Sequence, residues 1–248
     1  MPAPDDQIYR DALEPSMNGS DRGFKRRAFL TGALSLAVSG CVANPLFKSL
    51  GESFSARRKQ SRQGAFSAQD VARLPYASMG VRIGESRQAL VVLAKNINDD
   101  LYWVTADQLL FVTRFGRLIR TNGLIKDLKT TRFGALDPVQ TGLQRVPPGG
   151  ETLVRFVDLR PAQPREKDVA ATSVFHPKEE DVITILGQPR VTLRVEEHVS
   201  YWRWNWHVKN QYWVDPGTGF VWKSLQHTAP QLGVTELEMF KPAAKLRA

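Results

Sequence analysis

The chain is poor in cysteine, because Cys41 is the single cysteine among its 248 residues. One thiol cannot form a disulfide within the chain, so the sequence predicts a fold without an internal disulfide. Histidine is scarce too, and no two histidines have the i, i+4 spacing of a helical metal site. We therefore expect no metal and no cofactor. The four histidines are His176, His198, His207 and His227.

Familiar catalytic motifs are also lacking. The sequence contains no G-x-S-x-G, no P-loop and no H-E-x-x-H. Acidic clusters occur at residues 179–181 and at Glu196-Glu197. A glycosidase needs two carboxylates at a defined separation, but neighbouring residues on a strand point to opposite faces. We predict that the protein is not an enzyme. Two carboxylates that flank one cleft would instead indicate a glycan-processing enzyme.

The charge balance is uneven along the chain. The formal net charge is +9, and the first 40 residues contribute nothing to it because their acidic and basic residues cancel. A basic body suits an anionic partner such as an acidic polysaccharide, a lipid head group or a nucleic acid. A solvated basic surface without a specific ligand explains the charge equally well.

Long apolar runs are missing as well. The charge-free run over residues 28–47 is interrupted by glycine, asparagine and proline, whereas a membrane-spanning helix needs about 20 apolar residues. The basic residues 25–27, the moderately apolar residues 28–37 and the small residues 38–40 have the order of a secretory signal. Arg26-Arg27-Ala28-Phe29-Leu30 is compatible with twin-arginine export as well as Sec export. Translation could start at Met1 or at Met17.

The end of this segment, "AVSGC", resembles a bacterial lipobox. The resemblance implies cleavage before Cys41, diacylglycerol on its thiol and a further acyl chain, such as palmitate, on its amine. Several chains give a stable membrane anchor, whereas one chain does not. We predict a lipoprotein signal peptide at 1–40 and a lipidated basic tether at 41–66. Val42 follows the cysteine, which by the enterobacterial sorting rule implies the periplasmic face of the outer membrane.

Residues 67–248 are predicted to form one β-rich domain. Ser67 is a candidate N-cap for a short helix over residues 68–74. The strand-length runs that follow indicate an all-β fold, an antiparallel sandwich or partly open barrel of roughly ten or more strands with one or two short helices. A boundary between two sub-sheets is expected near residue 148. The predicted strands cover residues 89–96, 100–106, 109–115, 152–159, 181–187, 190–199, 201–208, 211–215 and 219–227.

Two motifs stand out, "VTADQLLFVTRFGRLIRTNGL" at 104–124 and "NQYWVDPGTGFVWKSLQHTAP" at 210–230. Both resemble the YjbF-type, group 4 capsule (exopolysaccharide) lipoprotein family, over about residues 67–242. Phe115 departs from the pattern, because Asn commonly precedes the turn glycine there and favours a type I′ turn. The family-motif positions are Gly116, Arg117, Thr121, Gly123, Trp213, Asp215, Gly219, Ser224 and Gln226.

These motif residues have a mainly structural interpretation. Asp215 precedes a Pro-Gly turn and can accept backbone N–H groups across it. Ser224 and Gln226 share one face of a strand and need polar partners if they are buried. Arg117 and Thr121 are candidates for those partners. A polar network that holds the fold is the first interpretation, and contact with a ligand is the second.

The segment "YWRWNWHVK" (201–209) is rich in tryptophan. On a strand, alternation would place Trp202, Trp204 and Trp206 on one face. Three indoles on one face would bury a large area in a core. If they are exposed, they would instead form a platform for sugar rings beside Arg203 and Lys209.

The family resemblance implies a non-catalytic outer-membrane lipoprotein that acts in exopolysaccharide or capsule export or assembly. Its expected partners are the membrane, an anionic polysaccharide and other secretion proteins, and no nucleic acid. The alternative is a periplasmic lipid or lipoprotein carrier. An apolar cavity of about 300–1,000 Å³ would favour the carrier, and a filled core with an exposed aromatic strip would favour the first interpretation.

Overall fold

The computed structural model describes residues 66–160 and 166–243, so the predicted signal peptide, Cys41 and nearly all of the tether lie outside the described residues. No helix in the described part is long and apolar enough to cross a membrane. The strands are β1 (Ser78–Ile83), β2 (Ala89–Ile97), β3 (Asp100–Val104), β4 (Leu110–Arg114), β5 (Arg117–Asn122), β6 (Asp127–Phe133), β7 (Glu151–Arg160), β8 (Val169–Ile185), β9 (Gln188–Tyr201), β10 (Trp206–Val214), β11 (Val221–Gln226) and β12 (Thr235–Lys241). The helical segments are α2 (Ala68–Ala72), α3 (Pro138–Thr141), η1 (Leu143–Arg145) and η3 (Trp202–Trp204).

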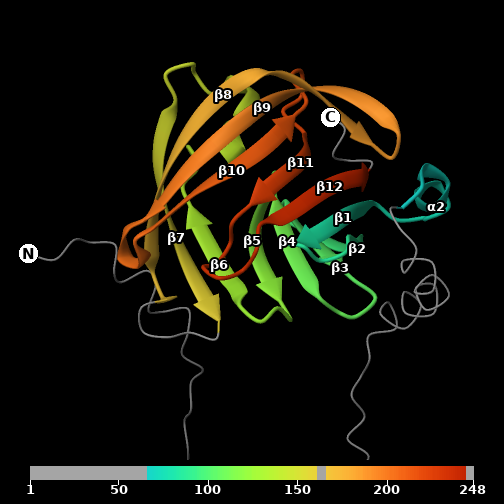
Figure 1. Cartoon of the computed structure of the whole chain (residues 1–248), viewed down its shortest axis with the longest axis horizontal. Coiled ribbons are helices and arrows are strands. Elements are labelled where there is room, and N and C mark those ends of the chain that lie inside the picture. The colour runs from blue at the N-terminus through green and yellow to red at the C-terminus, as the bar shows by residue number, and fades with distance from the viewer. Residues whose placement is uncertain (1–65, 161–165, 244–248) are drawn as a thin grey trace, which may run out of the picture. The chain divides into compact units, whose positions relative to one another are not determined.

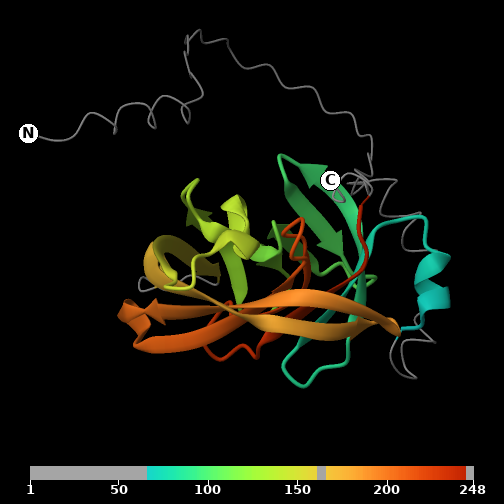
Figure 2. The same ribbon diagram turned by 90° about the horizontal axis from the view of Figure 1, so that it is seen from above.

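All twelve strands belong to one antiparallel sheet (Figures 1 and 2). The strand order is β5-β4-β3-β2-β1-β12-β11-β10-β9-β8-β7-β6, so neighbours in the sheet are neighbours in the chain except where β1 pairs with β12. The sheet therefore joins the first and last strands, and its two edge strands, β5 and β6, follow each other in the chain. Successive hairpin turns alternate between the two ends of the sheet because the strands are antiparallel.

Side chains join the two edge strands. The Thr121 hydroxyl donates to Asp127 Oδ1 at 2.9 Å and accepts from the backbone N–H of Leu128 at 2.9 Å. The other Asp127 oxygen accepts from the backbone N–H of Gly123 at 3.1 Å. These bonds turn the sheet into a nearly closed barrel. The prediction of an all-β, antiparallel fold with one or two short helices is confirmed, and of its two alternatives, a sandwich and a partly open barrel, the structure has the barrel.

Tight turns set the register of several hairpins. Asn98-Asp99, Phe115-Gly116 and Leu186-Gly187 each place two successive residues at positive φ, which is the φ pattern of a type I′ turn. Phe115 adopts φ 49° without the help that Asn would give. The strands on either side therefore impose the turn, although its first residue is not one that favours it.

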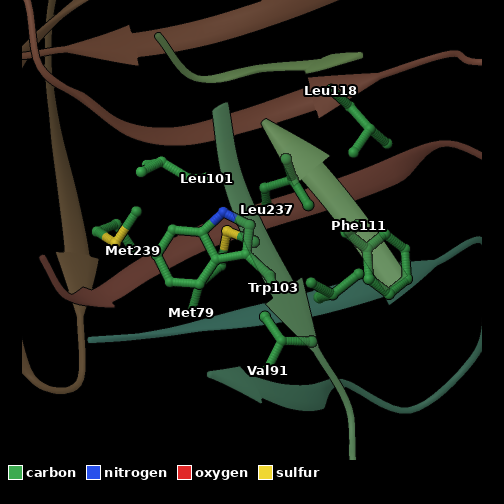
Figure 3. Packing of buried hydrophobic residues seen from close by; sticks show 9 residues of the cluster. Met79, Val91, Leu101, Trp103, Phe111, Leu118, Leu237 and Met239 are labelled. Carbon is green, nitrogen blue, oxygen red and sulfur yellow. The ribbon is translucent and has the colours of Figure 1, made fainter. Parts of the chain in front are cut away.

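The interior beside β1–β5, β11 and β12 is apolar (Figure 3). Trp103 is completely buried there, and its indole N–H donates to Thr113 Oγ1 at 2.9 Å. Such a bond removes the cost of burying the one polar atom of the ring. The rest of this buried cluster consists of Met79, Val81, Val91, Leu101, Phe111, Leu118, Leu237 and Met239.

The inward-pointing side chains of β7 and β9 fill the other half of the barrel. On β7, Val157 and Leu159 point inward, whereas Val154 and Phe156 are exposed. On β9, Val195 and Val199 are buried and pack with residues of β8 and β10. Period-two burial of this kind is the local reason why these segments form half-buried strands. The inward positions between the apolar residues hold the polar groups described below.

Several local predictions are confirmed. Ser67 caps α2 through a capping box, in which its hydroxyl accepts from the Asp70 backbone N–H while the Asp70 carboxylate accepts from the Ser67 backbone N–H. Strands occur where the sequence predicts them over 89–96, 100–106, 109–115, 152–159 and 190–199. The sheet is continuous across residue 148, because β6 and β7 pair with each other. The sub-sheet boundary expected there is therefore not seen in the described residues.

The tryptophan-rich segment does not form one strand, so that prediction is wrong. β9 ends at Tyr201, η3 covers Trp202–Trp204, and Asn205 at φ 46° turns the chain into β10. Pairing of Tyr201 with Trp206 closes this hairpin. A turn breaks the two-residue alternation on which a single tryptophan face depended.

Candidate functional site

The two sequence motifs meet inside the barrel. The Gln226 side chain on β11 reaches β5 and the turn before it, where its amide donates to the Gly116 carbonyl at 2.8 Å and its carbonyl accepts from the Leu118 N–H at 2.9 Å. The same amide donates to Ser224 Oγ at 2.9 Å. Ser224 bonds to Gln226 itself, and the further partners of Gln226 come from the first motif. They are backbone groups, however, and not the Arg117 or Thr121 side chains that the sequence suggested.

Glycines allow this close approach. A Cβ at Gly116 would lie 2.5 Å from Val221 of β11, and the residue has φ 85°. A Cβ at Gly219, with φ 74°, would lie 2.2 Å from Gln144 Oε1. Real Cβ atoms do not come so close to other atoms, so both positions favour glycine for space as well as for backbone conformation. The two motif glycines thus mark where the β4–β5 turn and the β10–β11 turn are packed.

The remaining motif residues have structural partners. Thr121 and Gly123 hold the seam between β5 and β6 through Asp127, as described above. Asp215 accepts from the backbone N–H groups of Gly217 and Thr218 at 3.1 and 2.8 Å, which confirms the expected turn. The Trp213 indole donates to Asp181 Oδ2 at 2.8 Å.

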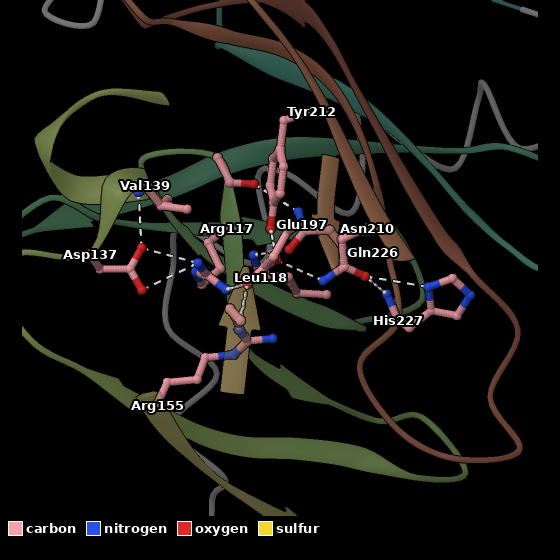
Figure 4. Close-up of polar contacts among 12 residues, drawn as sticks. Arg117, Leu118, Asp137, Val139, Arg155, Glu197, Asn210, Tyr212, Gln226 and His227 are labelled. Carbon is pink, nitrogen blue, oxygen red and sulfur yellow. Dashed lines mark hydrogen bonds and ion pairs between the residues drawn. The ribbon is translucent and has the colours of Figure 1, made fainter. Parts of the chain in front are cut away.

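A cluster of buried charges lies at the centre of the barrel (Figure 4). Glu197 of β9 is completely buried, and its Oε1 accepts from Arg117 Nη1 at 2.9 Å, from Arg155 Nη1 and from Ser173 Oγ. Its Oε2 accepts from Asn210 Nδ2 at 2.8 Å and from the Tyr212 hydroxyl at 3.0 Å. Five donors from four different strands, β5, β7, β8 and β10, therefore converge on one carboxylate.

The cluster continues to the segment between β6 and β7. Arg117 Nη2 donates to Asp137 Oδ1 at 3.1 Å, and both side chains are only 2% exposed. Asp137 is also the N-cap of α3, where it accepts from the Val139 N–H at 2.9 Å. A motif arginine thus connects the barrel centre to the α3–η1 segment. Electrostatic attraction between buried groups is strong enough to fix the position of that segment.

Opposing effects determine the pKa values of this cluster. Burial alone would raise the pKa of Glu197, but the charges of Arg117 and Arg155 outweigh it and hold that pKa well below its usual value. Burial likewise lowers the pKa of Arg117, and Glu197 more than compensates by raising it. Burial raises the pKa of Tyr212 well above 10. These groups keep one charge state across the physiological pH range, so the cluster is not suited to proton transfer.

The sequence drew attention to the Glu196-Glu197 pair but did not identify the cluster. The two side chains do lie on opposite faces of β9, as the alternation predicts. Glu196 is on the outer face, with Lys209 Nζ 3.3 Å and His198 Nε2 3.2 Å from its Oε2. Burial raises the pKa of Glu196, and these partners outweigh burial and lower it to about 2. The one available signal for Glu197 was an acidic residue at an inward position between Val195 and Val199.

A cavity of about 380 Å³ opens at the end of the barrel where the β2–β3, β4–β5 and β10–β11 turns lie. Met79, Leu101, Leu237 and Met239 form an apolar floor (Figure 3). The α3–η1 segment lies over one side and contributes Gln144. Within the described residues Gln144 Oε1 is buried and has no hydrogen-bond partner. The motif residues Gly116, Gly219 and Ser224 also line this cavity.

The three tryptophans of the predicted platform lie on the β9–β10 hairpin and do not line the cavity. Trp202 is 71% exposed, whereas Trp204 and Trp206 stack on Tyr201 with ring centroids 5.2 and 4.9 Å away. Two of the three indoles thus pack against the barrel, and the exposed one meets only the edge of the His207 ring among the aromatic contacts of the described residues. Of the predicted flanking cations, Arg203 donates to the Lys167 carbonyl at 2.7 Å, and Lys209 pairs with Glu196.

The described residues include no group of His, Cys, Asp and Glu that could hold a metal ion. Asp99 is the acid among the described residues that line the cavity, and the buried acids Glu197 and Asp137 both pair with Arg117. The arrangement can bind a molecule at the barrel end and can hold the surrounding turns in place.

Comparison with known proteins identifies several relatives. The chain is 24% identical over 217 residues to the uncharacterized lipoprotein GfcB of Escherichia coli (strain K12), covering 88% of this chain and 99% of GfcB. It is 32% identical over 147 residues to the uncharacterized lipoprotein YjbF of the same strain, covering 59% of this chain and 66% of YjbF. The crystal structure of the hypothetical lipoprotein YmcC from E. coli (K12) has the same fold, with a TM-score of 0.68, 22% identity and coverage of 86% of this chain and 99% of YmcC.

The family comparison covers both motifs and almost the entire barrel. The family described as group 4 capsule polysaccharide lipoprotein GfcB, YjbF matches residues 43–240, about four-fifths of the chain, and the chain therefore belongs to this family.

Proposed function

We propose that this chain is a non-catalytic lipoprotein that acts in the export or assembly of an exopolysaccharide or capsule at the periplasmic face of the outer membrane. The observation that carries the proposal is the family match over residues 43–240. It is supported by the position of the family motifs, which meet inside the barrel through Gln226 and surround one end of it. The work of such a protein is binding, to the polymer or to other secretion proteins.

The proposed location rests on the N-terminal segment. Cys41 follows a lipobox-like "AVSG", and the basic residues of the tether could lie on anionic lipid heads, where each Lys or Arg contributes about 1 kcal/mol. Val42 in the position after the cysteine supports the outer membrane as the destination. A tether of this length would let the barrel reach a polymer or a partner near the membrane surface.

The location and the role can be tested together in the producing organism. We expect Cys41→Ser to leave the outer-membrane fraction and to reduce the amount of polymer at the cell surface, and we expect the same reduction after deletion of the whole gene. Val42→Asp is the matched control, because it keeps the lipid and changes the sorting signal, and it should move the chain to the inner membrane. Normal polymer export after deletion of the gene would refute the proposed role. Unchanged fractionation of Cys41→Ser would refute the anchor.

A periplasmic lipid or lipoprotein carrier is the second candidate. The observation that favours it is the cavity of about 380 Å³ with an apolar floor, because small-molecule sites usually measure about 300–1,000 Å³. An acyl chain would then occupy the barrel end. The two candidates differ in the chemistry of the molecule that the cavity binds, and the titration described below distinguishes them.

A further inference from the structure

We propose that the cavity at the barrel end is a saccharide-binding site that takes a short segment of a glycan chain, with Trp222 as its stacking surface and Gln144 as a hydrogen-bonding group. This assignment deepens the proposed function and rests on it. It places glycan recognition among the motif turns and not at the tryptophan-rich hairpin between β9 and β10.

The shape of the site suits a small ligand that enters from one end of the barrel. Turns from three hairpins and the α3–η1 segment surround the cavity, and their residues include Asp99, Phe115 and Thr218. A volume of about 380 Å³ is near the lower end of the range for small-molecule sites, which suits about one or two sugar rings. A polymer would therefore contribute a chain end or a short branch, because the floor of the cavity is closed by the apolar cluster of the barrel.

An aromatic wall with a fixed orientation is the first feature expected of a sugar site. Trp222 lines the cavity, and its ring meets Phe220 in a T-shaped contact with centroids 4.7 Å apart. The Arg190 guanidinium lies over the Trp222 ring, 3.7 Å from its centroid. A cation at this distance is attracted to the ring and holds it in place. The C–H faces of a sugar ring can pack against such an indole, whose area gives most of the affinity.

Polar groups among the apolar ones are the second feature. The lining side chains are polar and apolar in equal number, and the polar ones include Thr113, Gln140, Gln144 and Ser224. Within the described residues the buried Gln144 Oε1 accepts no hydrogen bond. Beside an acyl chain this oxygen would stay unsatisfied, which costs free energy. A sugar hydroxyl can donate to it, so the lining favours a hydroxylated ligand over a hydrocarbon.

The position of Gln144 is built into the fold. The α3–η1 segment that carries it is held to the barrel centre by the Arg117–Asp137 ion pair. Gly142 and Gly219 leave room for its carboxamide, because a Cβ at either position would lie within 2.7 Å of Oε1. Preorganisation of a binding group in this way lowers the entropy lost on binding.

The test is a calorimetric titration of the full-length Cys41→Ser chain, which carries no lipid. The probe is the set of oligosaccharides of about two to six sugars that partial acid hydrolysis releases from the organism's own exopolysaccharide. Gln144→Leu should weaken binding about tenfold, because it removes the hydrogen bond and keeps the side-chain volume. Trp222→Ala should weaken it by about tenfold or more through loss of the stacking surface.

Trp202→Ala is the matched control. It removes an indole that is 71% exposed on the β9–β10 hairpin, and β10 separates this hairpin from the cavity because its two turns lie at opposite ends of the strand. We expect binding within about twofold of the parent chain. Gln144→Leu lies outside the barrel strands, so it tests the site even if Trp222→Ala fails to fold.

Three results would overturn the assignment. One is the absence of binding by any of the oligosaccharides. Another is binding that Trp202→Ala abolishes and Gln144→Leu leaves intact. A third is that decanoate binds, that Trp222→Ala and Gln144→Leu change its affinity, and that the oligosaccharides do not displace it. This result would support the carrier. Normal polymer export by the deletion strain refutes the proposed function whatever the titration gives. Impaired export without oligosaccharide binding refutes the cavity assignment alone.

Discussion

At the scale of single residues, Glu197 carries an unusual share of the interactions of this barrel. It is completely buried and accepts from two arginines, a serine, an asparagine and a tyrosine. A buried ion pair adds little net stability compared with well-packed apolar residues. The cost of breaking it is large, however, because the partner charges remain buried without compensation. The cluster therefore acts mainly by specifying which strands face each other.

The buried cluster predicts the effect of Glu197→Gln. The substitution leaves Arg117 and Arg155 buried with only Asp137 to balance them, and we expect the free energy of unfolding to fall by about 3–5 kcal/mol. Urea unfolding followed by tryptophan fluorescence measures the change. Glu196→Gln is the matched control on the outer face, where the partners are solvent-exposed side chains, and it should cost about 1 kcal/mol or less. Equal losses for the two variants would contradict the assigned role.

At the scale of elements, the two-residue turns determine how the motifs meet. Gly116 and Gly187 occupy equivalent positions in their hairpins, with φ 85° and 77°. They differ in their surroundings, because a Cβ at Gly116 would lie 2.5 Å from Val221, whereas a Cβ at Gly187 would meet nothing within 4 Å. The same substitution at the two positions therefore separates backbone strain from crowding.

We expect Gly187→Ala to cost about 1 kcal/mol, which is the penalty for an alanine at positive φ. Gly116→Ala carries the same penalty and also crowds Val221, so it should cost about 1–3 kcal/mol more. The difference between the two midpoints of urea unfolding, at unchanged slope, measures the crowding. If the two variants unfold at the same urea concentration, then the β4–β5 turn does not pack closely against β11.

The individual strands show how much of this fold can be predicted from the sequence. Segments with clear alternation between turn residues, such as β2, β3 and β9, were predicted close to their observed bounds. β1 was missed because Gly80 interrupts its pattern, where a Cβ would lie 2.6 Å from Phe240. The first half of β8, at 169–180, was missed because small residues and Pro177 weaken its alternation. The 201–208 strand was wrong because a helical turn follows Tyr201 without a glycine or proline to mark it.

The polar interior was harder to predict than the strands. Glu197 lies 80 residues from Arg117 and 42 from Arg155, and the sheet order alone determines that they meet. A partner in the first motif was expected for Ser224 and Gln226, and it is found for Gln226, whereas Ser224 bonds to Gln226. The sequence suggested the side chains of Arg117 and Thr121, but the partners are backbone groups of Gly116 and Leu118. Every residue has such backbone groups, so the residue types do not reveal which of them will pair.

At the scale of the whole described domain, most of the groups with shifted pKa values make the fold less stable as the pH falls. The pKa values of Glu196 and Glu197 are lowered, the first to about 2, and burial lowers the pKa of His227. Each of these groups binds its proton more readily in the unfolded chain, so stability falls as the pH falls. The loss begins below about pH 6.5 with the histidine and deepens below about pH 4.5 with the two glutamates. The raised pKa of Tyr212 adds a loss above about pH 10.

We therefore expect the free energy of unfolding to be nearly constant between about pH 7 and pH 9 and to fall most steeply below about pH 4.5. Glu197→Gln removes one carboxylate whose pKa is far below that of the unfolded chain. Between about pH 4.5 and pH 3 the free energy of unfolding of the variant should fall less steeply than that of the parent chain, because the variant takes up one proton fewer on unfolding. The two slopes should differ by up to about 1.4 kcal/mol per pH unit. Urea unfolding of both chains at a series of pH values measures the two slopes. Because the substitution also lowers the stability at neutral pH, the comparison uses slopes and not absolute values, and identical slopes would mean that Glu197 is not charged in the folded barrel.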